Sequence, residues 1–367
     1  MRRFFLLILF LAVAVCAFVW LVPVGPAPPS ETFVEIAPGT STRQIASQLQ
    51  TQHIIRSRYA FEALRLFKGG TLKAGEYRFD HPARLSEVYG RLQHGDVYTV
   101  GLTVPEGANI FDIAQRVEAA KLGTRATFLK AAMSDMSLIK DIDPGAHSLE
   151  GYLFPDTYRF PKRVAPDQIV AAMVRQFRHS EAEIGLSRMY GNPMPPGARA
   201  DLTAVHRVVT LASLIERESP IPAERPLVAS VFVNRLAKGM PLDTDPSVIY
   251  AALLQGRYRG AIYQSDLAAD SPYNTYRHEG LPPGPICNPG LASLRAAMAP
   301  AHTDYLYFVA ASADPSGHSR FSSTLAEHSQ DVQIYRRAIG EPEHSEKAAP
   351  VAPVLHPKSR RRHFKVR

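Results

Sequence analysis

The chain has 367 residues, of which 46% are hydrophobic and 21% charged, enough to bury a large core in two or three domains. Its formal net charge of +8 is misleading, because six positive charges lie in the last eleven residues and two more are Arg2 and Arg3. The rest of the chain is close to neutral, which excludes the basic patch that a nucleic-acid-binding domain needs.

Residues 4–22 form an uncharged run that would be about 28 Å long as a helix, enough to cross a bilayer. Arg2 and Arg3 precede this run, and the next basic residue is Arg43, which predicts a cytoplasmic stub at residues 1–3 and export of the rest. We therefore expect a single-pass anchor in the bacterial inner membrane, with the remaining chain in the periplasm. A cleaved signal peptide is the alternative, but no clear small-x-small site follows the run.

The proline-containing residues 23–33 predict an extended linker, and residues 34–100 predict a small αβ module. Strands and helices are expected in this module at 34–36, 43–49, 58–67, 72–79 and 86–93. The segment Ile36–Ala46 is similar to Val104–Ala114, since each has a strand, a glycine turn and a capped helix. This beginning resembles LysM-type modules, which hold glycan chains; a generic αβ unit is the alternative.

Residues 101–340 predict a larger mixed domain, so the fold class is α+β. Helices are expected near 125–132, 169–179, 205–218, 222–236, 245–254, 288–298 and 325–339, and strands at 305–310 and 319–321. Residues 148–160 predict a packed, non-regular segment, and Asp245-Pro246 and Asn288-Pro289 predict helix starts. Residues 341–367 predict a disordered basic tail.

The stretch Val205–Pro220 places two carboxylates, Glu216 and Glu218, at the end of an amphipathic helix. Each glutamate flanks the apolar stripe, so periodicity cannot choose between them. Partial burial and the negative end of the helix dipole raise the pKa of a carboxyl group at this place, as a general acid requires. The alternative is that both are solvated and pair with arginines such as Arg217 or Arg225.

The run Ser271–Gly290 is too long for an ordinary connection and too rich in proline and glycine for a helix. Its tyrosines and amides suit the apolar faces and hydroxyl edges of a sugar, although a rigid surface loop is equally consistent with this composition. Serine-hydrolase, zinc-protease and phosphate-binding motifs are missing from the sequence. No metal or cofactor is predicted, and Cys287 has no partner for a disulfide, since Cys16 lies in the apolar run.

Several long segments in order closely resemble the endolytic murein transglycosylases of the YceG-like family. These are LEGYLFPDTY, LASLIERES, VASVFVNRLAKGMPLDTDPSVIYA, SPYNTYRHEGLPPGPICNPGLASLRAAMAP, YLYFVA, and G-H-x-x-F followed by LAEH. The resemblance implies cleavage of the β-1,4 bond between N-acetylmuramic acid and N-acetylglucosamine inside glycan strands, with 1,6-anhydro ends and shorter nascent strands. It makes Glu218 the catalytic acid and base and gives Ser219 a supporting role.

The resemblance also implies a transglycosylase domain over residues 101–340, peptidoglycan strands as substrate, and cell-wall synthases such as penicillin-binding proteins as candidate partners. Six residues are candidates for the substrate groove, each with packing or capping as the alternative role: Asn234, Asp245, Tyr273, Asn274, Tyr276 and Glu150. Two other functions stay open, a membrane-tethered glycan-binding scaffold and a hydrolytic muramidase. Muramidases usually place two carboxylates around the bond, whereas a transglycosylase can use one.

Overall fold

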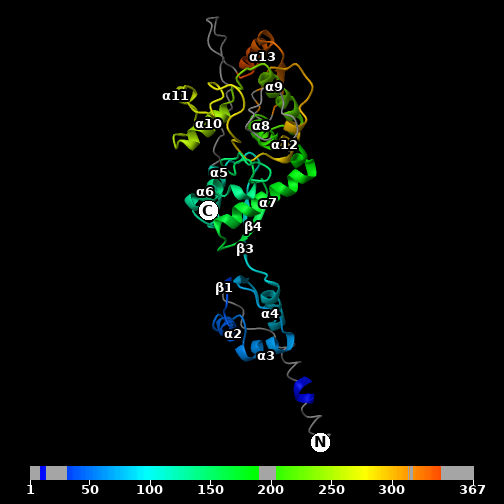
Figure 1. Cartoon of the computed structure of the whole chain (residues 1–367). Helices are drawn as coiled ribbons and strands as arrows, with labels where there is room; N and C mark the ends of the chain where they lie inside the picture. The colour runs from blue at the N-terminus through cyan, green and yellow to red at the C-terminus, as the bar shows by residue number, and fades with distance from the viewer. Residues whose placement is uncertain (1–8, 14–30, 190–203, 313, 315–316, 340–367) are drawn as a thin grey trace. The chain divides into compact units, whose positions relative to one another are not determined.

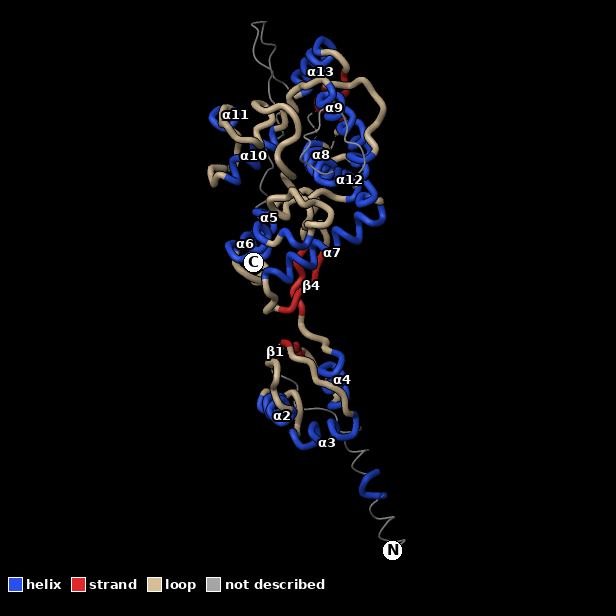
Figure 2. Tube along the Cα trace, in the orientation of Figure 1, coloured by secondary structure: helices blue, strands red, loops and turns tan. Residues whose placement is uncertain are grey.

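The computed structural model describes residues 9–13, 31–189, 204–312, 314 and 317–339. The chain divides into two compact units, Met1–Gly101 with Arg159–Val164, and Leu102–Tyr158 with Ala165–Arg367. The short strands form three separate two-stranded sheets, and helices make up most of the regular structure (Figure 2). The described part therefore mixes helices with small sheets.

The predicted single-pass anchor, and with it the inner-membrane location, is corrected by the structure. Crossing the hydrocarbon core takes roughly 20 apolar residues in one helix. Within the described ranges, no helix has the length and apolar character needed to span a bilayer. Of the predicted span over residues 4–22, only the helical residues 9–13 are described. Residues 23–30 of the linker predicted over 23–33, and the tail predicted over 341–367, lie outside the described residues, whereas Thr32 and Phe33 belong to a strand.

Among its described residues from Glu31 onward, the first unit packs three helices with one antiparallel strand pair. Its elements are β1 (Thr32–Ile36), α2 (Thr42–Thr51), α3 (Arg58–Lys68), β2 (Gly75–Phe79) and α4 (Leu85–His94). In the sheet, Val34 lies opposite Tyr77, and both side chains are buried in the core between strands and helices. Ser41 and Ser57 end the preceding loops by accepting backbone N–H groups of α2 and α3, which is why these helices begin where they do.

The second unit is mainly helical. The strands β3 (Thr99–Thr103) and β4 (Thr157–Pro161) pair in one sheet, and each strand has residues assigned to both units. In chain order, the helices from the start of this unit to the buried helix α8 are α5 (Ile110–Ala119), α6 (Arg125–Ser134), η1 (Met136–Leu138), α7 (Pro166–Ile184), η2 (Leu186–Met189) and α8 (Ala204–Glu218). The later elements are η3 (Pro222–Glu224), α9 (Arg225–Ala237), α10 (Asp245–Leu254), α11 (Gln264–Leu267), α12 (Leu291–Met298), β5 (Tyr307–Ala310), β6 (Ser319–Ser322) and α13 (Leu325–Ala338). Figure 1 shows α8, α9 and α12 grouped together in this unit.

Two helix starts and one strand differ from the sequence analysis. The residue preceding α10 is Thr244 and the one preceding α12 is Gly290, so neither Asp245 nor Asn288 is the N-cap. The reason is that both side chains have partners elsewhere in the fold, as described below. The segment 148–160, expected to be non-regular, contains the first residues of β4.

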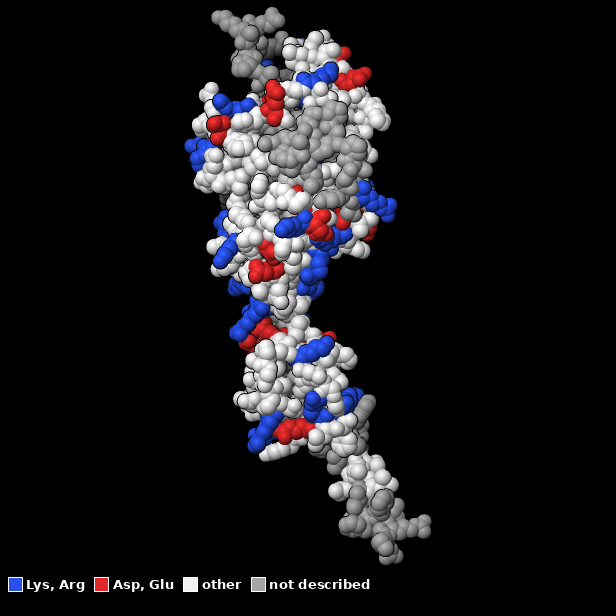
Figure 3. Space-filling model, viewed as in Figure 1, with Lys and Arg blue, Asp and Glu red and all other residues white. Residues whose placement is uncertain are grey.

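Charged side chains of the two signs are interspersed on the face shown in Figure 3, which has no extended patch of one sign. This distribution agrees with the near-neutral body of the chain.

Candidate active site

Helix α8 carries both glutamates in its last turn. It is buried along most of its length, through the following residues: Val205, His206, Val208, Val209, Thr210, Leu211, Ala212, Ser213, Leu214 and Ile215. It packs against α9, α10 and α12 (Figure 1). Because helices surround it, the end of α8 has a fixed position within the second unit.

Glu216 is held in a buried ion pair. The two guanidinium nitrogens Nη2 and Nη1 of Arg225 donate to its Oε1 at 2.8 Å and to its Oε2 at 3.2 Å, and both side chains are 5% exposed. The backbone N–H of Gly290 donates to Oε2 at 3.0 Å. Burial raises the pKa of Glu216, and Gly290 and Arg225 oppose that shift. Glu216 thus ties the end of α8 to the starts of α9 and α12.

Ser219 follows directly and is also buried. Its hydroxyl accepts the N–H of Ile221 at 3.3 Å and lies 3.1 Å from the carbonyl oxygen of the same residue. Its own carbonyl accepts Nε of Arg225 at 3.4 Å. These bonds shape the turn between α8 and η3, which gives Ser219 a defined structural role.

Glu218 has different surroundings, with its side chain half-buried at the last position of α8. Loss of hydration is the main cause that raises its pKa to about 8. The negative charge of Asp245 adds to the shift, while the positive charges of Arg217 and Arg235 oppose it. A carboxyl group with such a pKa is protonated at neutral pH and can act as a general acid.

Asp245 and Tyr276 lie beside Glu218. The Tyr276 hydroxyl donates to Oδ1 of Asp245 at 2.7 Å. Burial is the main cause that raises the pKa of Tyr276, and the charges of Asp245 and Glu218 add to it. The structure therefore brings together three of the predicted site residues, from α8, from α10 and from the irregular run.

The start of α10 and the irregular run are joined just beside this group. The Thr275 hydroxyl accepts the backbone N–H of Thr244 at 2.9 Å and lies 2.9 Å from the Ser247 hydroxyl. Thr244 directly precedes Asp245, and Thr275 directly precedes Tyr276. These bonds therefore fix Asp245 next to Tyr276. Asp245 is the first residue of α10, and its carboxylate holds the tyrosine rather than capping the helix.

Asn274 is fully buried inside the irregular run. Its amide donates to the carbonyl oxygens of Leu267 at 2.9 Å and Ala269 at 2.8 Å, and its Oδ1 accepts the N–H of Tyr276 at 3.1 Å. All of these partners are backbone groups, so Asn274 shapes the run and orients the tyrosine. Tyr273 lies against Tyr250, with ring centroids 5.2 Å apart.

Two further predicted residues have structural contacts elsewhere. Glu150 is fully buried, and its oxygens accept the N–H of Ile110 at 3.0 Å and the amide of Asn288 at 2.8 Å. Burial raises its pKa to about 8. Asn234, on α9, donates to the carbonyl oxygens of Thr303 at 2.7 Å and Tyr305 at 2.9 Å.

A second buried polar group was missed by the sequence analysis. The Asp143 carboxylate accepts the Tyr152 hydroxyl at 2.5 Å and lies 2.6 Å from Nδ1 of His206, while Nε2 of His206 lies 2.9 Å from the carbonyl oxygen of Pro283. These bonds connect α8 to the irregular run. No sequence motif marks them, because the partners are far apart in the chain.

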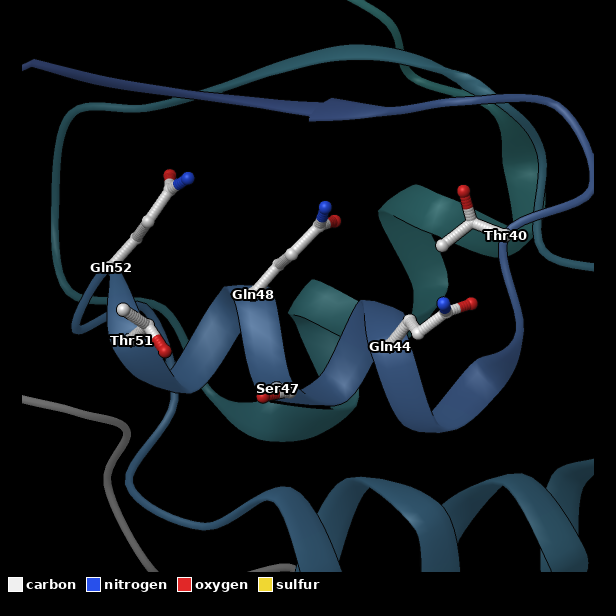
Figure 4. A pocket seen from close by; sticks show the side chains of 6 residues that line it. All are labelled: Thr40, Gln44, Ser47, Gln48, Thr51 and Gln52. Carbon is white, nitrogen blue, oxygen red and sulfur yellow. The ribbon is translucent and has the colours of Figure 1, made fainter.

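The described residues contain two pockets of interest. One, of about 420 Å³, lies in the first unit and is lined only by uncharged polar side chains: Thr40, Gln44, Ser47, Gln48, Thr51 and Gln52. Gln48 of α2 and Gln52, the residue directly after this helix, point to the same side (Figure 4). The buried Oε1 of Gln52 has no hydrogen-bond partner within the described part of the chain. The other pocket adjoins Arg217 in the second unit. Across the described ranges, no group of three or more His, Cys, Asp and Glu side chains could hold a metal ion.

Comparison with known proteins identifies the family to which this chain belongs. The model of the YceG-like family matches residues 34–334. The chain therefore belongs to the YceG-like family, which confirms the resemblance seen in the sequence. A crystal structure of a YceG-like protein from Listeria monocytogenes is 34% identical, with a TM-score of 0.51, and the match covers 82% of this chain and 99% of that one.

Two curated relatives carry an enzyme name. The endolytic murein transglycosylase of Bacillus subtilis is 37% identical over 320 residues, which are 82% of this chain and 84% of the relative. The endolytic murein transglycosylase of Streptococcus pneumoniae is 28% identical over 343 residues, which are 85% of this chain and 60% of the relative. These relatives confirm the prediction that the chain is an enzyme.

Proposed function

We propose that this chain is an endolytic transglycosylase that cleaves the β-1,4 bond between N-acetylmuramic acid and N-acetylglucosamine in murein strands. The names of its relatives support the reaction class and the polymer. The observation that supports the site is the half-buried Glu218, whose pKa is raised to about 8 in a group with Asp245 and Tyr276. Glu216 is a weaker candidate, since Arg225 and Gly290 occupy its oxygens.

In the proposed reaction, the carboxyl group of Glu218 protonates the glycosidic oxygen as the bond to the muramyl C1 breaks. The muramyl C6 hydroxyl then forms a bond to C1 and returns its proton to the Glu218 carboxylate. The products are a 1,6-anhydro end and a new N-acetylglucosamine 4-hydroxyl, and no water is consumed. Asp245 favours the protonated form of Glu218 through its charge, and Tyr276 holds Asp245 in place.

A hydrolytic muramidase is the second candidate, because Asp245 supplies another carboxylate near Glu218. Hydrolases of glycosidic bonds usually have two carboxyl groups flanking the bond. The two reactions differ in their products, since hydrolysis leaves a reducing sugar and transglycosylation an anhydro sugar.

The deciding experiment is mass analysis of the fragments that the purified full chain releases from murein sacculi. We expect anhydro ends with the wild-type protein and almost none with Glu218→Gln. Glu183→Gln removes an exposed carboxylate of α7 and serves as the matched control, with wild-type activity expected. Reducing ends would favour the muramidase, and full activity of Glu218→Gln would place the acid elsewhere.

We also propose that residues 34–100 form a LysM-like module that binds the glycan through the pocket on α2, and that residues 101–340 form the catalytic domain. Support comes from the lining, since amide and hydroxyl groups without charges suit the hydroxyl and acetamido groups of an uncharged sugar. Replacing Gln44 and Gln48 with alanine should reduce pelleting of the full chain with sacculi, while Arg43→Ala on the same helix should not. Association with cell-wall synthases stays a prediction.

A further inference from the structure

The pocket beside Arg217 has a volume of about 490 Å³ and lies in the second unit. Its walls come from the turn around Gly107, from α5 and from the last turn of α8. Four charged side chains line it, two of each sign: Glu106, Asp112, Arg116 and Arg217. Nothing in the proposed cleavage reaction uses this pocket.

The two arginines keep most of their hydrogen-bonding capacity. Arg116 donates to the carbonyl oxygen of Thr103 at 3.4 Å, and Arg217 donates to that of Gly107 at 3.3 Å. Neither guanidinium forms an ion pair with a carboxylate within the described ranges. A guanidinium has five N–H donors in a planar arrangement that matches a carboxylate. The arginine side of the pocket therefore suits an anionic group.

The acidic side chains complete a surface of mixed charge. One oxygen of Asp112 accepts the backbone N–H of Asn109 at 3.1 Å, which leaves its other oxygen available. Glu106 is half-exposed and lies 3.7 Å from Arg225. Opposite charges in one pocket suit a ligand that carries both a carboxylate and an amine, and they disfavour a purely anionic or uncharged ligand.

We propose that this pocket binds the peptide attached to the muramic acid of the murein strand, with Arg116 and Arg217 receiving its carboxylates and Glu106 or Asp112 its amine. This inference rests on the proposed function, because it assigns a second part of the same substrate to a second site. Murein peptides are short chains that bear free carboxylates and an amine, which matches the charges that line the pocket.

The pocket lies close enough to Glu218, the proposed acid, for a peptide on the bound sugar to reach it. Arg217 directly precedes Glu218, so their Cα atoms are about 3.8 Å apart. A peptide of three or four residues spans at most roughly 10–14 Å when extended. A peptide that begins on the sugar bound at Glu218 is therefore long enough to reach the pocket.

Peptide binding would also affect the proposed acid. The positive charge of Arg217 lowers the pKa of Glu218. A carboxylate bound at Arg217 would counter this effect and favour the protonated form of Glu218. The alkaline limb of the activity profile should therefore lie at higher pH with peptide-bearing strands than with strands from which an amidase has removed the peptides.

The test uses the disaccharide of N-acetylglucosamine and N-acetylmuramic acid, with and without an attached tripeptide that ends in diaminopimelate. The disaccharide has no internal bond of the type to be cleaved, so calorimetry with the full chain measures binding alone. We expect the peptide form to bind about tenfold more tightly, which corresponds to one charge-assisted contact of about 1.4 kcal/mol. Arg116→Gln should abolish this difference, and Arg125→Gln, which removes an exposed charge at the start of α6, should retain it.

Cleavage assays separate this inference from the proposed function. On peptide-bearing strands, Arg116→Gln should raise KM about tenfold with little change in kcat, and on peptide-free strands it should resemble the wild-type protein. Equal affinity of the two disaccharides for the wild-type chain would overturn the inference even if both kinds of strand are cleaved. An equal loss by Arg116→Gln on both kinds of strand would also overturn it. Absence of cleavage alone would refute the proposed function.

Discussion

The two glutamates of α8 offer the sharpest prediction. The same substitution to glutamine should reduce turnover at one position and stability at the other. Glu218→Gln keeps the shape of the side chain but cannot deliver a proton. General acid–base catalysis contributes about 10²–10⁴-fold, so we expect a loss of kcat of at least this size with binding and melting temperature nearly unchanged. Because the half-buried carboxyl group of Glu218 has a pKa of about 8 and is protonated at neutral pH, its replacement by an amide removes no charge.

Glu216→Gln should instead reduce stability. Arg225 is 5% exposed and would lose the charge that balances it. Removing one partner of a buried ion pair costs about 3–5 kcal/mol. We expect the lower end, about 3 kcal/mol, because the new amide oxygen can still accept the Gly290 N–H and Glu106 lies 3.7 Å from Arg225.

Calorimetric melting and turnover on murein strands measure the two effects separately. A loss of 3 kcal/mol lowers the melting temperature of a domain of this size by roughly 6–12 °C. Assays well below that temperature should then show Glu216→Gln within about tenfold of wild-type turnover. If both variants lose turnover equally while Glu216→Gln melts normally, the assignment of one glutamate to structure and the other to chemistry is refuted.

Three further predictions concern charge and packing. Asp245→Asn should move the alkaline limb of kcat/KM to lower pH, because the negative charge of Asp245 raises the pKa of Glu218; an unshifted pH profile would contradict this. The pKa of Glu150 in the folded protein is raised to about 8. Between the pKa of this group in the unfolded chain and pH 8, the folded state holds a proton that the unfolded state has lost. The free energy of unfolding should therefore fall as the pH rises through this range. Melting curves from pH 5 to 9 should show this fall, and Glu150→Gln should show a flatter dependence. Gly151→Ala should cost about 3 kcal/mol in chemical denaturation, because Gly151 has a φ of +89° and its new Cβ would lie 2.5 Å from Cγ of Pro285; a normal unfolding midpoint would show that the backbone adapts there.

Local sequence patterns predicted most helices, because spacing and capping are local properties. The apolar spacing of Val205–Ile215 placed α8, and the helix predicted near 325–339 corresponds to α13, which begins with a capping box of Thr324 and Glu327. The pattern at Asn288-Pro289 was misleading. Asn288 looks like a helix cap in the sequence, but its side chain accepts the N–H of Leu153 and donates to Glu150, so the helix begins only after Gly290.

The candidate site could not be predicted from local patterns alone, because its residues are distinguished by contacts between segments far apart in the sequence. Periodicity left Glu216 and Glu218 equivalent, and the family resemblance alone favoured Glu218. In the structure they differ because Arg225, nine residues from Glu216, occupies one carboxylate, while Asp245 and Tyr276 lie near the other. Asn274 illustrates the same limit, since its amide bonds to the backbone carbonyls of Leu267 and Ala269, which only the folded run brings within reach, whereas the Ser219 hydroxyl bonds to Ile221 two residues along the chain.

The proposed separation of a catalytic role for Glu218 from a structural role for Glu216 within one helical turn has a simple physical basis. Residues two apart on a helix point about 200° away from each other, so Glu216 and Glu218 face different neighbours. A general acid must be held within a fraction of an ångström of its productive position, and the end of a helix is prone to fray. The ion pair of Glu216 with Arg225, together with the Gly290 N–H, fixes the last turn of α8 from one side. The other side is thereby free to present Glu218 in partly desolvated surroundings, where its raised pKa suits proton transfer at neutral pH.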